Sequence, residues 1–416
     1  MSITILTAFC TALATLASAP DSDRLYGRVL TVEGQSFEGF VRWDRNEATG
    51  LDFLDGRKVV PLEYLQEAAS LDPEVAARQR EERTIVAFGM RISWDEDDQA
   101  DPFATASAIR MSRIRSLERV DRRTVRLTLK DGGDVELLAA SSDIGRGMRG
   151  LEIERVDGSP VTLDWHEIER LDFFDGPPAG ARSEAQRLHG TVTTWNDHDF
   201  VGAVTWDLDE SVGTDVLDGR SGSEDYEIAF EDIAEIAWES DRSALVTMKD
   251  GVQLELRGTN DVNRENRGIE IAGTFGRAIV EWEDFQRVRF HEEYRQAPTI
   301  SGSAHLQGTV RAIDGRQITG RVRWDNDEEF AWEVLDGWFA DSDLDVEFGA
   351  IASIEKRSER EVEVTMWDGT RFTLEDRNDV DERNNGIFVQ PEGRSRRLVR
   401  WVDFERVDFV RPEGGR

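Results

Sequence analysis

The chain has 416 residues and is strongly acidic, with 85 Asp and Glu against 51 Lys and Arg and a formal net charge of -34. Because this charge repels a phosphate backbone, we expect no nucleic-acid partner. Alternating apolar runs broken by Asp-Gly and Gly turns, with almost no helical periodicity, predict an all-β protein.

The N-terminal segment, residues 1–19, has no charged side chain and ends in small residues. This composition predicts a signal segment that is removed on export, and so a periplasmic or extracellular protein. The single cysteine, Cys10, lies inside the segment, so we expect the mature chain to have no disulfide. No later apolar run approaches the length that crosses a membrane, so we expect no transmembrane span after signal removal.

A long internal repeat occupies most of the chain. Each copy runs from a Gly through a Trp-Asp pair to a Leu-Asp-Gly, at constant spacing, and this predicts three domains at 24–177, 187–292 and 305–412. The Trp-Asp pairs are Trp43-Asp44, Trp206-Asp207 and Trp324-Asp325.

Each copy has two halves that end in one apolar signature, seen clearly in Val399-x-Trp401-x-x-Phe404-x-x-Val407. The apolar residues are spaced by two, then by three, and then by two again. This spacing predicts a strand, a single helical turn and a second strand. Two related halves in each of three copies predict six small β units. The first copy also carries an insertion at about 57–107, where Asp72-Pro73-Glu74 predicts the start of one short helix.

These patterns resemble tandem SH3-like or Sm-like small barrels. The residues that carry the resemblance are a Gly-x-Val strand, a hairpin into Gly-x-Val-x-Trp, and the strand, turn and strand ending at Val407. The fold class that we predict is all-β, with three tandem two-part repeats of small SH3-like barrels. A six-bladed β-propeller is the alternative, because six units of about fifty residues also suit six blades. The resemblance implies a binding or spacing module.

The tryptophans divide into two groups by their position in the repeat. Strict alternation places Trp43 and Trp206 on the apolar face of their strands and predicts that they pack in the core. Trp332 and Trp338 lie outside this phase, on either side of a Leu-Asp-Gly turn. Trp195 and Trp367 are also outside the phase, so all four are candidates for contact with a ligand.

Two recurring polar features are the candidate sites. The acidic turn after each repeat Trp could supply oxygen ligands to Ca²⁺, although the EF-hand spacing is missing and a solvated hairpin end is the interpretation that we favour. The weak metal candidates are Asp207, Asp209, Glu210, Asp325, Asp327 and Glu328. The second feature is the loop at 143–150, 261–268 and 379–386, whose Asp and Gly are explained by loop geometry. Its arginines Arg264, Arg267 and Arg383 are candidates for binding a partner carboxylate.

No catalytic motif accompanies these features. The five histidines are scattered, and the sequence has no nucleophile elbow and no phosphate loop, so we expect no catalytic residue and no cofactor other than the Ca²⁺ alternative. The function that we predict is an exported, non-enzymatic β-repeat protein that acts as a binding or scaffold module for a protein or glycan partner. The alternatives are a calcium-dependent or carbohydrate-binding surface protein and a carboxylate-based glycoside hydrolase.

Overall fold

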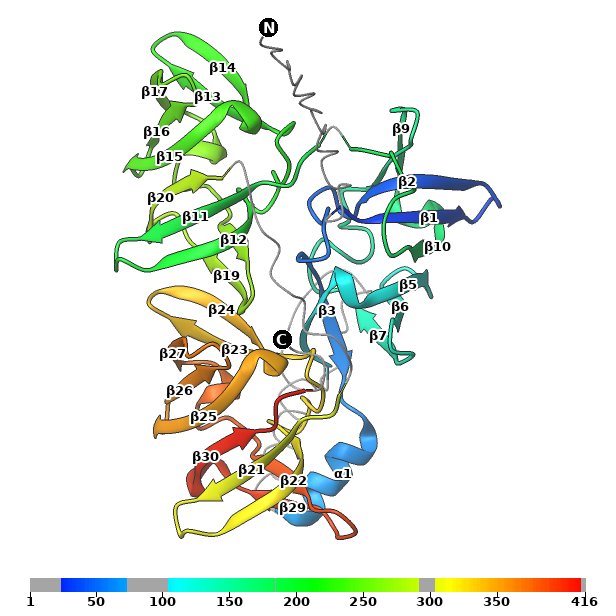
Figure 1. Cartoon of the computed structure of the whole chain (residues 1–416), viewed down its shortest axis with the longest axis vertical. Coiled ribbons are helices and arrows are strands. Elements are labelled where there is room, and N and C mark those ends of the chain that lie inside the picture. Colours follow the sequence, from blue (N-terminus) through cyan, green and yellow to red (C-terminus); the bar gives the residue numbers. More distant parts are fainter. Residues whose placement is uncertain (1–23, 73–103, 184, 292–303, 413–416) are drawn as a thin grey trace, which may run out of the picture.

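The computed structural model describes residues 24–72, 104–183, 185–291 and 304–412 (Figure 1). The predicted all-β class is confirmed, because antiparallel strands make up nearly all the regular structure in these residues. One α-helix, α1 (Leu62–Leu71), lies within the predicted insertion. Asp72 ends this helix, and the helix predicted to start there lies outside the described residues, as does the signal segment.

The first sheet is formed by residues of the first copy, here called the first module. Its strands are β1 (Tyr26–Thr31), β2 (Ser36–Arg42), β3 (Phe53–Val59), β4 (Ala104–Arg110), β5 (Ile114–Arg119), β6 (Thr124–Leu129), β7 (Asp134–Leu138), β8 (Leu151–Glu154), β9 (Pro160–Leu163) and β10 (Ile168–Phe173). They pair in the order β4-β3-β7-β6-β5-β10-β1-β2-β8-β9.

The second sheet contains the strands of the second and third modules. Those of the second are β11 (His189–Thr194), β12 (Asp199–Thr205), β13 (Val216–Ser221), β14 (Glu224–Ala229), β15 (Ile233–Ser240), β16 (Ser243–Met248), β17 (Gln253–Arg257), β18 (Ile269–Ala272), β19 (Gly276–Val280) and β20 (Phe285–Phe290). Those of the third are β21 (Gln307–Ala312), β22 (Gln317–Arg323), β23 (Val334–Phe339), β24 (Ser342–Glu347), β25 (Ile351–Ser358), β26 (Glu361–Met366), β27 (Arg371–Glu375), β28 (Ile387–Gln390), β29 (Arg397–Val399) and β30 (Phe404–Phe409).

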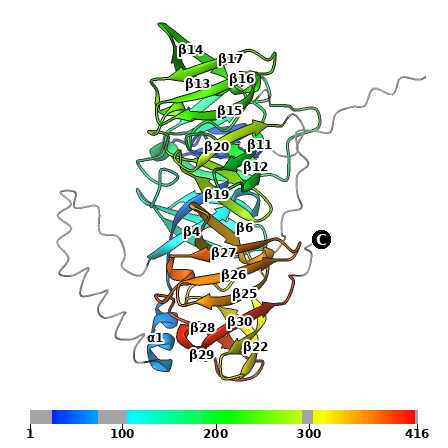
Figure 2. The same ribbon diagram turned by 90° about the vertical axis from the view of Figure 1, so that its left-hand side faces the viewer.

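The strand order of the first sheet recurs in both modules of the second sheet. The second module pairs as β14-β13-β17-β16-β15-β20-β11-β12-β18-β19, and the third follows the same order from β24 to β29. The two modules join where β19 pairs with β24, so the sheet runs without a break along the molecule (Figures 1 and 2).

Two parts of the predicted architecture are wrong. The strands form open sheets and close no barrel among the described residues, and the strand order is not the plain meander of a propeller blade. The halves of a module also exchange strands, because β12 of one half pairs with β18 of the other, and β13 pairs with β17. The chain folds back on itself at the turn between Trp206 and Glu210, and then continues to β13, which pairs with β14 and β17.

The predicted strand, helical turn and strand of the apolar signature are confirmed. Short 3-10 turns precede β5, β10, β15, β25 and β30, and they span Met111–Arg113, Trp165–Glu167, Phe230–Asp232, Phe348–Ala350 and Trp401–Asp403. The predicted core position of the repeat tryptophans is also confirmed, because Trp43 and Trp206 have no exposed surface. Each meets a second Trp edge to face, at 6.2 Å from Trp165 and 6.3 Å from Trp282 between ring centroids.

The helix of the insertion lies against the edge strand of the third module (Figures 1 and 2). Ala68 of α1 is buried on Phe388 and Leu398, and Glu67 pairs with Arg396 at 3.1 Å, next to β29. Covering a sheet edge with a helix prevents another strand from pairing with it. In the described residues, no helix has both the length and the apolar character needed to cross a membrane.

Candidate functional site

The acidic turn after Trp206 has an unusual backbone. Asp207 and Leu208 both have positive φ, 51° and 52°, a region that non-glycine residues rarely adopt. The same pair of positive angles occurs at Asp44 and Arg45 and at Asp325 and Asn326. Since two such residues in a row cost free energy, the surrounding contacts must hold each turn in place.

The contacts come from the loop at 261–268, so the two polar features of the sequence form one site. Asp207 accepts hydrogen bonds from the backbone N–H of Arg267 and from the Asn260 side chain. The indole Nε1 of Trp206 donates to the backbone oxygen of Asp261 at 2.9 Å, and the Asp261 carboxylate accepts from the backbone of Asp218 at 2.7 Å. The loop therefore covers the turn.

Three carboxylates meet beneath this loop, and we call them the second acid pocket: Asp207, Glu210 and Asp261. One oxygen of each lies within 4.8 Å of the others, and Oε2 of Glu210 is buried without a hydrogen-bond partner. Burial, together with the negative charges of Asp261, Asp209 and Asp207, raises the pKa of Glu210 to about 9. Burial also raises the pKa of Asp261 to about 6. The pocket therefore favours a bound positive charge or a retained proton.

The turn and its facing loop recur in the other two modules, but among the described residues only Asp207, Glu210 and Asp261 bring three carboxylate oxygens within 4.8 Å of one another. Glu47 and Glu328 hold the place of Glu210, and Oε2 of each is buried without a hydrogen-bond partner. In the third module Lys58, from β3 of the first module, supplies a positive charge. Its Nζ lies 3.7 Å from Oε1 of Glu328 and 2.7 Å from the backbone oxygen of Asp327, and it also pairs with Glu333. In the third module an ammonium group therefore lies beside the buried Glu328.

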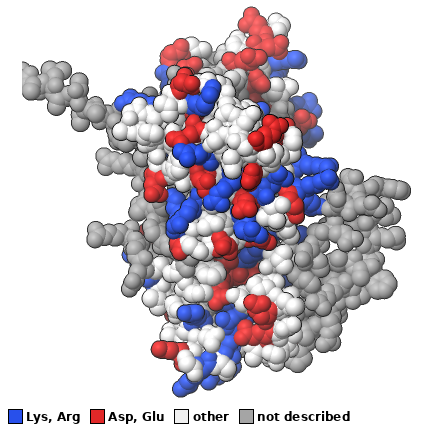
Figure 3. All heavy atoms as spheres, turned by 90° about the vertical axis from the view of Figure 1, so that its right-hand side faces the viewer, with Lys and Arg blue, Asp and Glu red and all other residues white. Residues whose placement is uncertain are grey.

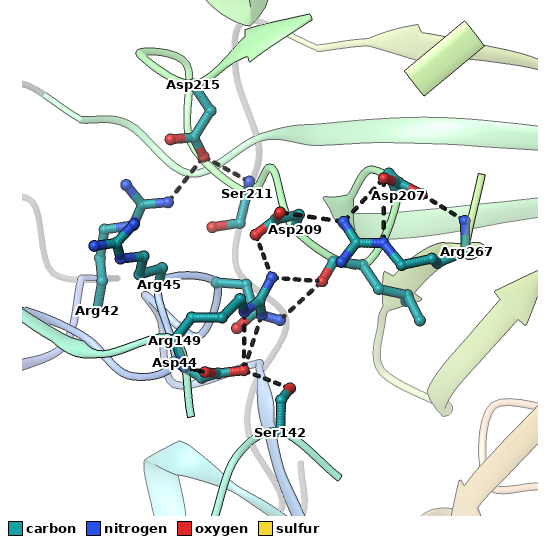
Figure 4. Close-up of polar contacts among 12 residues, drawn as sticks. Arg42, Asp44, Arg45, Ser142, Arg149, Asp207, Asp209, Ser211, Asp215 and Arg267 are labelled. Carbon is teal, nitrogen blue, oxygen red and sulfur yellow. Dashed lines mark hydrogen bonds and ion pairs between the residues drawn. The ribbon is translucent and has the colours of Figure 1, made fainter. Parts of the chain in front are cut away.

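The interpretation of these turns as solvated hairpin ends is therefore wrong. Asp207, Asp325, Asp327 and Glu328 are buried, because the facing loop and the neighbouring modules cover them. Asp209 is half-buried, and it pairs with Arg267 at 3.1 Å and also with Arg149 of the first module (Figure 4).

Another acidic residue, which caps each turn, makes the contacts between modules. Asp215 accepts from the backbone N–H groups of Ser211 and Val212 and pairs with Arg42 of the first module at 2.9 Å (Figure 4). In the first module, Asp52 caps its turn in the same way and pairs with Arg187 at 2.8 Å. In the third module, Glu333 caps the turn and pairs with Lys58. In each of the three modules, the acid that caps the turn therefore forms an ion pair with a different module.

Two of the arginine candidates, Arg264 and Arg267, lie on the loop at 261–268, and Arg383 lies on the corresponding loop of the third module. Arg267 pairs with Asp207 at 2.9 Å, and Arg383 pairs with Asp381 of its own loop, while the side chain of Arg264 is exposed. Arg267 and Arg383 thus already have carboxylate partners within the chain.

The two tryptophan candidates have different environments. Trp332 is buried in the core of the first module, so its predicted role in an exposed contact is wrong, because it lies at the junction between modules. Trp338 is half-buried, and the guanidinium of Arg377 lies 5.1 Å from its ring centroid.

Several important residues were missed by the sequence analysis. Asp261 was explained as a loop former, and Asp52, Asp215 and Glu333 were not singled out. The available signal was the constant spacing of Asp and Glu in the turns, since Asp44, Asp207 and Asp325 are each followed three residues later by Glu. Comparison with protein-family models, with curated proteins and with solved structures found no match to this chain.

Proposed function

We propose that the chain is an exported, non-enzymatic β-repeat protein that acts as a binding or scaffold module for a protein or glycan partner. The observation that carries this proposal is the repeated use of the turn-capping acid. Asp52, Asp215 and Glu333 each pair with a basic residue of another module. Contacts built into every module favour a single extended body that presents surfaces, and acidic and basic side chains are interspersed on one such face (Figure 3).

We further propose that the second acid pocket binds Ca²⁺ and thereby stabilises this body. Ca²⁺ takes oxygen ligands at about 2.3–2.6 Å, so two ligands of one ion lie at most about 5 Å apart. The 4.8 Å limit that contains the oxygens of Asp207, Glu210 and Asp261 meets this condition. Lys58 supplies positive charge beside Glu328 in the third module. Among the described residues no lysine or arginine forms an ion pair with Glu210, so a bound cation would supply that charge in the second acid pocket.

The other functions have less support. A glycoside hydrolase needs carboxyl groups that a sugar can reach on both sides of the bond to be broken, whereas Asp207 is fully buried and Asp261 nearly so. A sugar-stacking surface built from Trp332 and Trp338 loses Trp332 to the core of the first module. The burial of the pocket carboxylates and of Trp332 favours ion binding over carbohydrate chemistry.

Thermal unfolding with added Ca²⁺ tests the cation. An ion that binds only the folded state stabilises it by about 2.7 kcal/mol at 100 times its dissociation constant. We expect Ca²⁺ to raise Tm more than NaCl at matched ionic strength, and we expect Glu210→Gln combined with Asp261→Asn to remove the difference. The exposed acid Glu265 provides the control Glu265→Gln, which should keep the Ca²⁺ response. An equal effect of NaCl and Ca²⁺ on the unchanged protein would contradict the cation site.

A further inference from the structure

The edge of β14 is free in the part of the chain that the structure describes. β14 pairs with β13 on one side only. Its counterpart in the third module, β24, pairs with β23 on one side and with β19 on the other. The same position in the sheet therefore accepts an added strand in one module and is left open in the other.

The register makes the two edges directly comparable. Leu217 lies opposite Ile228 as Leu335 lies opposite Val346, so Glu227 of β14 holds the place of Asp345 in β24. Asp345 lies opposite Arg277 of β19, and Nε of Arg277 is 2.7 Å from its carboxylate. Glu227 thus offers a carboxylate where the third module uses one to bind an arginine.

The free edge is acidic and accessible. Glu224, Asp225 and Glu227 are exposed, and Tyr226 between them is half-buried. Within the chain, the counterpart of β19 in the first module is β9, where Pro160 stands in the place of Arg277. Proline has no N–H to donate and no positive charge, so β9 lacks the residue that would meet Glu227.

We propose that β14 is a docking edge for an extended basic segment of another protein, which adds to the sheet as an antiparallel strand. The segment places Arg or Lys opposite Glu227, as Arg277 lies opposite Asp345. It also needs Gly opposite Ile228, because a Cβ on the corresponding Gly276 would lie 1.8 Å from a backbone oxygen of β24. Backbone hydrogen bonds supply affinity in such strand addition, and the side-chain pair supplies specificity. This inference rests on the proposed binding function and names its partner class.

A peptide copied from β19 provides the probe. Labelled Thr-Phe-Gly-Arg-Ala-Ile-Val-Glu, residues 274–281, is titrated with the full chain and followed by fluorescence anisotropy. We expect binding that weakens at least tenfold in Glu227→Arg and less in Glu227→Gln. A peptide with Arg277→Glu should bind Glu227→Arg better than it binds the unchanged chain. The control Glu169→Arg makes the same charge change at an exposed site in the first module and should leave binding unaltered.

Equal binding to the unchanged chain and to Glu227→Arg, with folding intact by circular dichroism, would overturn the proposal. So would self-association that Glu227→Arg abolishes, because a second copy of the chain would then be the occupant of the edge. Failure of the peptide to bind would remove β14 as the docking edge. It would leave the Ca²⁺ response unaffected, so it is distinguishable from failure of the proposed cation site.

Discussion

Arg187 and Asp52 form a buried ion pair that joins the second module to the first. Nη2 of Arg187 lies 2.8 Å from Oδ1 of Asp52, and both side chains are almost completely buried. Burial alone raises the pKa of Asp52, but the charge and hydrogen bonds of Arg187, with two backbone N–H donors, outweigh it and lower the pKa overall. The carboxylate therefore depends on its arginine partner.

Removal of that partner is expected to be costly. Arg187→Ala leaves the charge of Asp52 buried without its counterion, which should lower the free energy of unfolding by about 3–5 kcal/mol. Arg220 pairs with Asp225 on the surface, so the matched change Arg220→Ala should cost less than about 1 kcal/mol. Chemical denaturation of both variants measures the difference. Equal losses would show that the pair between modules is not important for stability.

Glu347 gives the stability a defined dependence on pH. Burial raises the pKa of this carboxyl, but Arg110 at 2.6 Å and Arg113 at 3.0 Å outweigh burial and hold the pKa below 4.5. A carboxyl whose pKa is lower in the folded state than in the unfolded state stabilises the fold at pH values above its unfolded-state pKa. This contribution is lost as the pH falls through its folded-state pKa. The stability difference between the unchanged chain and Glu347→Gln should therefore be constant near neutral pH and shrink below about pH 4.5. Denaturant midpoints measured from pH 7 to pH 3 check this, and a constant difference would contradict it.

Trp206 connects the core to the acid pocket. Trp206→Ala should cost about 3–5 kcal/mol, because it leaves a cavity and an unpaired backbone oxygen on Asp261. Trp206→Phe keeps most of the ring and should cost less. Trp195 is half exposed and serves as the control, since Trp195→Ala should cost under about 1 kcal/mol. An unchanged denaturation midpoint for Trp206→Ala would show that the ring is not part of the core.

The docking of α1 can be disrupted without touching either sheet. Ala68→Arg forces a long charged side chain into the contact with Phe388 and Leu398, so α1 should detach and its amides should exchange faster with solvent. Gln66 is exposed on the same helix, and Gln66→Arg should leave exchange unchanged. Hydrogen exchange by mass spectrometry over residues 62–71 makes the comparison. Equal protection in the two variants would contradict the contact.

The sequence predicts local structure better than connections between elements. Alternation placed Trp206 in the core, and the step of three before Phe404 predicted a turn between strands, because both depend on neighbours in the chain. Strand exchange between the halves could not be predicted, since it depends on where the chain goes after the turn at Trp206. The burial of the acidic turns was missed for a similar reason. Asp207 is covered by a loop about sixty residues away, and Asp327 by Lys58 of another module.

The central claim is that Asp207, Glu210 and Asp261 hold a calcium ion, and terbium luminescence tests it most directly. Tb³⁺ also binds oxygen ligands, and the indole of Trp206 contacts Asp261, so a bound ion would receive excitation energy from it. We predict Trp-sensitised emission that Ca²⁺ competes away, and we predict its loss in Glu210→Gln combined with Asp261→Asn but not in the control Glu265→Gln. Emission of equal strength in the double variant, with folding intact, would contradict the claim.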